Sequence, residues 1–369
     1  MENFLSISCQ HDNAQAVIKD CLQQLELIPT EFNFGFIYAT DAMSAEYPDL
    51  LQQCKQHTGI EHWLGTLGVG IIAPGKEIYD QPAVSIMLAQ FDVNEFTMLP
   101  LIKNISELTS VKWPHDFFTN FGILHGDPFH QHTQNLIEDI QQQVEECFLV
   151  GGLTSSGDKQ YQIADELFSD GISGVFFSEK IPVLTNLSQG CSPIGIKRTI
   201  THAKDNVAVR LNNEPALDVL MEEMNISEFS ELQERASEIF AGLCIPNSDK
   251  SDYTVRNLVG VDLEKKLFAI NDRLTEGHEM MFCERNEQTA VNDLQHMLDN
   301  ISRRLKQKPK GGLYVSCLGR GRQQFGQNSE EIKMIHNTLG DFPLTGFFAN
   351  GEIHHNKLYG YTGVLTLFT

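Results

Sequence analysis

The chain has 369 residues, 41% of them hydrophobic, and its 27 Lys and Arg stand against 49 Asp and Glu, a formal net charge of −22. A chain of this length and apolar content can bury a sizeable core and is long enough for two lobes. Its negative charge repels the phosphates of nucleic acids and of anionic membranes, so we expect neither as a partner.

The N-terminus and the cysteines indicate the compartment. MENFLSISCQHDN has no basic region followed by an apolar stretch, so we expect no signal peptide. The most apolar tract, Trp63–Pro74, is too short and too interrupted by glycine to span a bilayer. The eight cysteines are scattered without a CxxC pair, which is typical of reduced thiols. We therefore expect a cytoplasmic protein.

A pattern of four successive elements occurs three times along the chain. Each copy begins with a short apolar strand, predicted at Asn33–Ala39, Phe121–His125 and Gly312–Leu318. A helix follows. Its apolar face is predicted from Leu136, Ile137, Ile140 and Val144 in the second copy, and from Ile332, Ile335 and Leu339 in the third. Asn328 with Glu331 three residues later predicts a capping box at the start of the third helix.

Each copy ends in two apolar, strand-like runs with glycines and a polar spacer between them. These pairs lie within Trp63–Phe91, Phe148–Ser178 and Phe342–Phe368. We interpret each pair as two antiparallel strands, so the repeated unit is β-α-β-β.

A different stretch separates the second copy from the third. Its pattern predicts strands at 199–211, 253–261 and 265–272, and helices at 215–224, 226–243 and 286–305. We expect a domain boundary near residue 195. The fold class is α/β (α+β), with two lobes of repeated β-α-β-β units, mixed sheets and outer helices. An α/β/β/α layering is one arrangement that would satisfy this pattern.

Six sequence blocks, in order, resemble the FIST domain, the domain named for F-box and intracellular signal-transduction proteins. The blocks are GGLTSSG from Gly151, QGCSPIG from Gln189, NEPALDVL from Asn213, YTVRNLVGVD from Tyr253, SCLGRGRQQFGQNSEE from Ser316 and GFFANGEIHHNKLYGYTGVLTLF from Gly346. The resemblance runs from about residue 30 to the end. It implies a FIST N-terminal region at 1–195 and a FIST C-terminal region at 196–369.

The resemblance also implies a function. FIST domains are thought to be sensory modules that bind small ligands such as amino acids. Some stand-alone bacterial members bind haem and report nitric oxide to a partner histidine kinase. The first 30 residues are too few for an F-box, and we find no kinase, cyclase or chemotaxis segment. We therefore expect a bacterial-type sensor that acts on a separate signalling protein.

Glycine-bearing loops supply the predicted ligand site. Arg320 and Arg322 lie in a loop with three glycines between a strand and a helix, where backbone N–H groups favour an anion. Glu352 with Arg320 could bracket the amine and carboxylate of an amino acid. The alternative is a set of structural turns with solvated arginines. The predicted ligand-binding residues are Gly152, Ser155, Cys191, Arg256, Cys317, Arg320, Arg322, Asn350 and Glu352.

The cysteines and histidines suggest two alternative functions. Cys191 and Cys317 lie in or beside loops and could serve an acyl- or amide-transfer enzyme, although either could equally be a buried small residue. His202 and His125 are the candidate axial ligands for a non-covalent haem, since no CxxCH motif is present. The leading hypothesis is a non-enzymatic small-ligand sensor. The alternatives are a haem-based nitric oxide sensor, a cysteine-dependent enzyme and a ligand-free adaptor.

Overall fold

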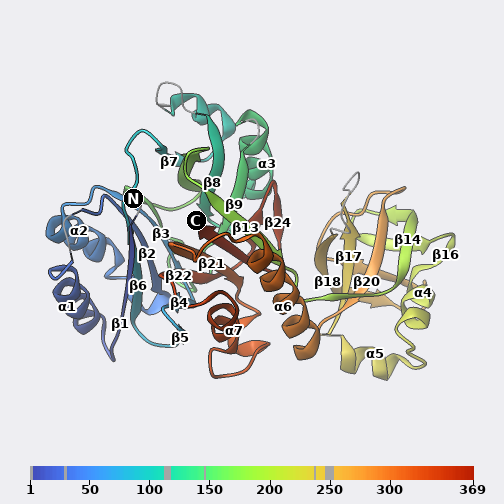
Figure 1. Cartoon of the computed structure of the whole chain (residues 1–369). Helices are drawn as coiled ribbons and strands as arrows, with labels where there is room; N and C mark the ends of the chain where they lie inside the picture. The colour runs from blue at the N-terminus through green and yellow to red at the C-terminus, as the bar shows by residue number, and fades with distance from the viewer. Residues whose placement is uncertain (1–2, 29–30, 112–117, 145–146, 237, 246–252) are drawn as a thin grey trace. The chain divides into compact units, whose positions relative to one another are not determined.

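The computed structural model describes residues 3–28, 31–111, 118–144, 147–236, 238–245 and 253–369 (Figure 1). The chain divides into two compact units. The first combines Met1–Ser188 with Leu294–Thr369, and the second is Gln189–Asp293. The boundary expected near residue 195 falls inside a strand of the second unit, Ser192–Lys204.

In the described residues, the first unit consists of three six-stranded mixed sheets. Sheet 1 has the order β1 (Phe4–Gln10), β6 (Ala83–Ala89), β2 (Phe34–Thr40), β3 (His62–Gly68), β10 (Gln162–Ala164), β11 (Glu166–Phe168). Sheet 2 has the order β24 (Lys357–Tyr359), β23 (Glu352–His354), β9 (Phe148–Leu153), β8 (Thr119–Gly126), β12 (Ile172–Ser178), β7 (Phe96–Ile102). Sheet 3 has the order β13 (Val183–Ser188), β25 (Gly363–Phe368), β21 (Gly311–Cys317), β22 (Leu344–Ala349), β4 (Gly70–Ala73), β5 (Lys76–Tyr79).

The same four strands form the body of each sheet. A central strand (β2, β8 or β21) runs parallel to the strand that follows it (β3, β9 or β22) and antiparallel to the last strand of its repeat (β6, β12 or β25). A further strand (β1, β7 or β13) pairs with that last strand. The three predicted repeats are therefore confirmed. Their two apolar runs, however, flank the central strand and do not pair with each other.

The short hairpin inside each repeat joins the sheet of another repeat. The hairpin β4–β5 of the first repeat pairs with β22 of the third, and β23–β24 of the third pairs with β9 of the second. The hairpin β10–β11 of the second repeat pairs with β3 of the first. The exchange runs once around the three repeats and closes, which locks them into one body.

The second unit is an insertion in the third repeat. In the first two repeats the chain passes from β1 to β2 through α1 (Ala14–Leu25), and from β7 to β8 through the short helix Ile105–Ser110. In the third, the whole second unit and α6 (Glu287–Arg304) lie between β13 and β21. All three repeats thus belong to the first unit, which differs from the expected sharing of repeats between two lobes.

The inner faces of the three sheets share one apolar core, and helices cover the outer faces. Alternate residues of β2 show this division. Phe36 and Tyr38 join the shared core, whereas Ile37 and Ala39 pack under α1 and α2 (Tyr47–Thr58). In the same way Leu124 of β8 packs with α3 (Thr133–Gln143). The mixed α/β class with outer helices is confirmed.

Three glycines occupy matching positions where strands approach closely. Gly65, Gly151 and Gly346 lie opposite Ile37, Leu124 and Tyr314 in the parallel pairs of the three sheets. A Cβ atom on these glycines would lie 1.8, 1.9 and 1.8 Å from the facing carbonyl oxygens. Only glycine fits at this point of the repeat.

In the described residues, the second unit is an antiparallel barrel accompanied by helices. Its order is β14 (Ser192–Lys204), β20 (Glu279–Glu284), β17 (Ile239–Cys244), β18 (Tyr253–Asp262), β19 (Leu267–Ile270), β15 (Val207–Leu211), β16 (Glu214–Pro215). Because β14 pairs with both β20 and β15, the sheet closes on itself. Helices α4 (Ala216–Glu223) and α5 (Phe229–Arg235) complete the unit.

Two sequence expectations for the second unit need correction. The helix predicted over 226–243 is only α5, and its last part is strand β17. Strand β20 was not predicted, although it pairs with both β14 and β17. The predicted loop at 247–252 lies outside the described residues. Among the helices that the structure describes, none is long and apolar enough to cross a bilayer.

Candidate functional site

Loops from four different segments meet at the ends of strands in sheets 2 and 3. The N–H of Leu318, just after β21, donates to Ala349 O at 2.9 Å. The N–H of Asn350 donates to Leu153 O at 3.0 Å. The N–H of Cys317 donates to Thr362 O at 2.8 Å. The ends of β9, β21 and β22 are thus tied together by backbone hydrogen bonds.

A fully buried ion pair lies at the centre of this region. Arg320 and Glu331 both have side chains with 0% exposure. The Nε atom of Arg320 donates to Glu331 Oε1 at 2.8 Å, and its Nη2 atom lies 2.7 Å from the same oxygen. The guanidinium also reaches Ser188 Oγ at 3.2 Å and lies over the ring of Phe325 at 5.0 Å. The acidic partner that the arginine requires is therefore Glu331 of its own chain.

The carboxylate of Glu331 is held by several donors as well as by the arginine. The hydroxyl of Tyr314 donates to Oε1 at 2.6 Å, and Ser316 Oγ lies 3.2 Å from both oxygens. The N–H of Gly321 donates to Oε2 at 2.9 Å. This network joins β21, the glycine loop and α7 (Glu330–Leu339), and it satisfies the buried charges.

Helix α7 begins without a side-chain capping bond. The helix has Ser329 at its N-cap position with no side-chain capping bond, and Glu331 is turned into the core. The predicted capping box of Asn328 and Glu331 is therefore wrong. The hydroxyl of Ser329 instead accepts a hydrogen bond from Glu77 N at 2.9 Å. The carboxylate of Glu331 pairs with the buried guanidinium of Arg320 instead of capping the helix.

The hairpin of the first repeat closes one side of the network. The hydroxyl of Tyr79, on β5, donates to Glu77 Oε2 at 2.8 Å and accepts a weak bond from Arg322 N at 3.4 Å. Gly321 has a φ of +50°, and a Cβ atom there would lie 2.0 Å from that hydroxyl. Burial and the charge of Glu331 raise the pKa of Glu77 to about 7. Tyr79 and Gly321 therefore fit together without room for a side chain.

Glu352 is a second buried carboxyl group beside the arginine. It has 0% exposure and lies opposite Gly152 in the β23–β9 pair. Its Oε2 atom accepts from Thr362 N at 3.1 Å and from Thr362 Oγ1 at 2.8 Å. Its Oε1 atom has no hydrogen-bond partner among the described residues. Burial raises the pKa of Glu352 to about 8, although the hydrogen bonds from Thr362 and, to a lesser extent, the charge of Arg320 offset part of the shift.

The remaining predicted residues of the first unit take several roles around this region. Ser155 bridges segments, because its hydroxyl donates to Phe348 O and accepts from Val69 N. Asn350 is exposed, and Cys317 is buried. Arg322 lies apart from the buried network, where it forms a two-point contact with Asp80 and stacks on the ring of Tyr79.

Three predicted residues belong to the second unit. The thiol of Cys191 is buried, and its carbonyl oxygen accepts from Tyr253 OH at 2.7 Å. Arg256 is paired with Asp272, with Nε 2.6 Å from Oδ2. The side chain of His202 is 57% exposed and lies 2.9 Å from Glu276 Oε1. Each of these side chains or its backbone is engaged within the unit.

Neither candidate haem ligand has suitable surroundings. His125 is fully buried, with Nδ1 2.8 Å from Leu124 O and Nε2 3.1 Å from Tyr38 OH, so both ring nitrogens are engaged. His202 is exposed, whereas a haem ligand stands in an apolar pocket. The residues present do not fit haem at either place. The part of the chain that the structure describes also contains no group of three or more metal-ligating side chains.

Sequence reasoning missed Glu331, Tyr314 and Glu77. One signal was available for the first of them. Glu331 lies four residues before Ile335 and is therefore on the buried face of the helix. A carboxylate on an apolar face requires a partner, and Arg320 in the preceding loop has the opposite charge. Tyr314 and Glu77 gave no such signal, because their strands are brought to the site by pairing alone.

The fold and the site define a mixed α/β protein of three exchanged repeats with an inserted barrel and a buried charge network. The model of the FIST N domain matches residues 33–214, and the model of the FIST C domain matches residues 216–355. The chain therefore belongs to the FIST family, which is associated with sensory signalling. The predicted family resemblance is confirmed.

Relatives in mycobacteria match most of the chain. Two proteins described as uncharacterized, from Mycobacterium tuberculosis and Mycobacterium bovis, are each 29% identical to it over 335 and 338 residues. The matches cover 87% of this chain, and 87% and 86% of the relatives. Among solved structures, a cyanuric acid hydrolase from A. caulinodans matches with a TM-score of 0.31 and 8% identity, over 100% of this chain and 99% of that one. So low a score carries no inference.

Proposed function

We propose that this protein is a sensor that binds a small molecule carrying a protonated amino group, such as an amino acid, and acts on a separate signalling partner such as a histidine kinase. The observation that carries the proposal is the buried Oε1 atom of Glu352, which has no hydrogen-bond partner among the described residues. A buried polar atom without a partner costs free energy, and a ligand group that pairs with it recovers that cost.

The charges around Arg320 favour a cationic ligand group. The guanidinium already has Glu331 as its partner, so an incoming carboxylate would have to displace an internal ion pair. Glu352 and Glu77, in contrast, have raised pKa values of about 8 and 7 and each retain an oxygen without a partner among the described residues. A nearby ammonium group stabilises the ionised form of a carboxyl group. Ligand binding near neutral pH should therefore release a proton from Glu352.

Family membership supports the signalling half of the proposal. FIST proteins are associated with sensory signalling, and this chain matches both FIST models over most of its length. The haem-based and cysteine-based alternatives have less support, because the candidate histidines are engaged elsewhere and the thiols of Cys191 and Cys317 are buried.

Calorimetric titration with a panel of free amino acids and simple amines tests the proposal. We expect at least one compound to bind the wild-type protein, with a heat that differs between phosphate and Tris buffers because a proton is released. Glu352→Gln should lower the affinity at least tenfold and abolish the buffer dependence.

Glu330→Gln is the matched control, since Glu330 is half-exposed on the same helix as Glu331 and pairs with the equally exposed Lys333. Its affinity should remain that of wild type. Unchanged binding in Glu352→Gln would contradict the proposed site. A wild-type protein that binds nothing in the panel would favour a ligand-free adaptor.

A further inference from the structure

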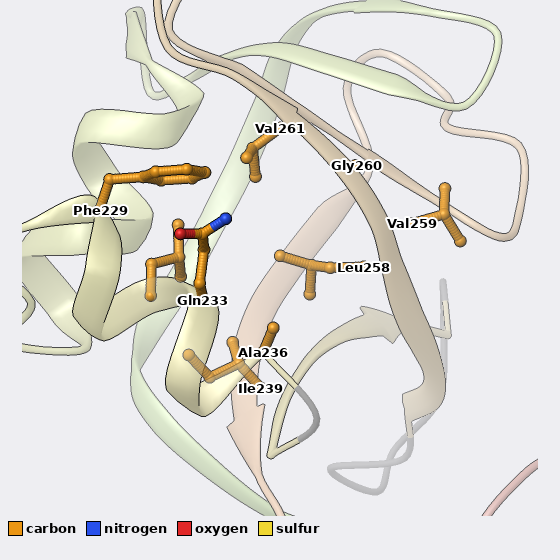
Figure 2. A pocket seen from close by; sticks show the side chains of 9 residues that line it. Phe229, Gln233, Ala236, Ile239, Leu258, Val259, Gly260 and Val261 are labelled. Carbon is orange, nitrogen blue, oxygen red and sulfur yellow. The ribbon is translucent and has the colours of Figure 1, made fainter.

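An apolar groove lies in the second unit, between helix α5 and the middle of strand β18 (Figure 2). Phe229, Leu232 and Gln233 line it from the helix, and Leu258 and Val261 line it from the strand. Figure 2 shows the side chains of Phe229, Gln233 and Leu258 directed towards the same space. Its volume is 260 Å³. The described residues that line this groove all belong to the second unit.

A local irregularity of β18 opens the groove. The pairing of β18 with β19 shifts register between Leu258 and Gly260, which bulges the strand at Val259. Gly260 then faces open space, because a Cβ atom at that position would meet no atom within 4 Å. Its φ lies outside the left-handed region, so a larger residue could stand there without backbone strain. Gly260 is exposed and lines the groove, so a side chain added there would enter open space at the groove.

The lining selects the chemistry of an occupant. Of the nine described residues that line the groove, Gln233 alone has a polar side chain, and none of the nine is charged. A charged ligand would lose its hydration there without a compensating partner. The amide of Gln233 offers an NH₂ group as donor and a carbonyl oxygen as acceptor. The lining therefore fits a neutral, mainly apolar molecule with a single hydrogen-bonding group.

The size of the groove decides between a small molecule and a protein partner. An apolar cavity of about 150 Å³ holds benzene, so 260 Å³ suits a molecule of about two fused rings. A stable protein interface uses about 20–30 residues on each side. Nine lining residues are too few for that.

We propose that the groove between α5 and β18 is a second ligand site, which takes a small neutral molecule with a bicyclic or similar apolar body and one hydrogen-bonding group. Its chemistry is opposite to that of the charged network around Arg320. A test of one site therefore does not depend on the outcome for the other. A chain with both sites can respond to two kinds of ligand.

Indole is a suitable probe, because it is bicyclic and neutral and has one N–H donor. Its binding to the full chain is measured by saturation-transfer NMR with titration. We expect saturable binding to wild type. Gly260→Leu should weaken it at least tenfold, because the new side chain fills the groove. Gln233→Leu should weaken it less, since only the hydrogen bond is lost.

Gly360→Leu is the matched control. Gly360 also has no atom within 4 Å of a Cβ position and no left-handed φ, but it lies in the first unit. That variant should bind indole as wild type does, and melting curves of both variants verify folding. The proposal is overturned if indole fails to bind wild type or binds Gly260→Leu equally well. It is also overturned if wild type self-associates and Gly260→Leu abolishes the association, because the groove would then be an interface between copies.

Discussion

The carboxylate of Glu331 accepts two contacts from the guanidinium of Arg320, at 2.8 and 2.7 Å, and both side chains are completely buried. Removal of one member of such a pair leaves an uncompensated charge in the interior. Glu331→Gln should therefore lower the free energy of unfolding by about 3–5 kcal/mol. Urea denaturation followed by circular dichroism measures the change.

The neighbouring residue provides the control for this prediction. Glu330 pairs with Lys333 on the surface, with both side chains 47% exposed. Exposed pairs of this kind contribute about 0.5 kcal/mol or less. If Glu331→Gln lowers the free energy of unfolding no more than Glu330→Gln does, the buried pair of Arg320 and Glu331 does not stabilise the fold.

The pH dependence of stability should reveal Glu352. Its pKa is about 8 in the folded protein against 4.5 for the free side chain, so between these values the folded state holds the extra proton. Stability contributed by this group is therefore greatest below pH 4.5 and declines as the pH rises to 8, by about 1.4 kcal/mol per pH unit. Glu352→Gln should flatten this decline in urea midpoints measured from pH 5 to pH 8. Parallel profiles for the two proteins would argue against a buried, neutral Glu352.

The pH dependence that His125 contributes to stability has the opposite sign to that of Glu352, because stability is lost as the pH falls. Burial lowers its pKa from 6.5 to about 4, so the unfolded state takes up the proton first as the pH falls. The contribution of His125 is complete above pH 6.5 and is lost between pH 6.5 and pH 4, by about 3 kcal/mol in total. His125→Gln should lack this acid-side loss in urea midpoints measured from pH 4 to pH 7. If the imidazole NMR signals of His125 titrate near pH 6.5, the buried neutral ring is excluded.

Gly65→Ala tests the close strand contact that the three repeats share. The new methyl group would lie 1.8 Å from the carbonyl oxygen of Ile37, so β2 and β3 must move apart. We expect a loss of at least about 2 kcal/mol in the free energy of unfolding, typical of overpacking. Gly360→Ala, with no atom within 4 Å, should change it by less than about 0.5 kcal/mol. Equal losses in the two variants would show that the contact is not restrictive.

Local patterns in the sequence were sufficient for the main elements of the repeats. The apolar runs of β2, β8 and β21 and the helical faces at Ile137 and Ile335 were all placed correctly, because burial of alternate or every-fourth residues leaves a period in the sequence. The strands β1, β7 and β13 were not predicted. They are only partly buried, so their apolar pattern is weaker.

The pairings around the candidate residues were not predicted from the sequence. Sequence order placed Arg320, Glu352 and Gly152 at strand ends, and the structure brings these strand ends together. It also gives Arg320 the partner Glu331 instead of Glu352 or a ligand. A buried arginine requires an acidic partner, but the sequence contains many carboxylates and does not show which of them lies beside Arg320.

The sequence by itself determined the composition, the repeated order of strands and helices and the family. Only the tertiary structure decided that each hairpin joins the sheet of another repeat, that a barrel is inserted in the third repeat, and that Tyr79 of the first repeat closes on Gly321 of the third. The period of a strand records which of its faces is buried. The identity of its neighbour depends on contacts between residues far apart in the chain, and no local pattern records those.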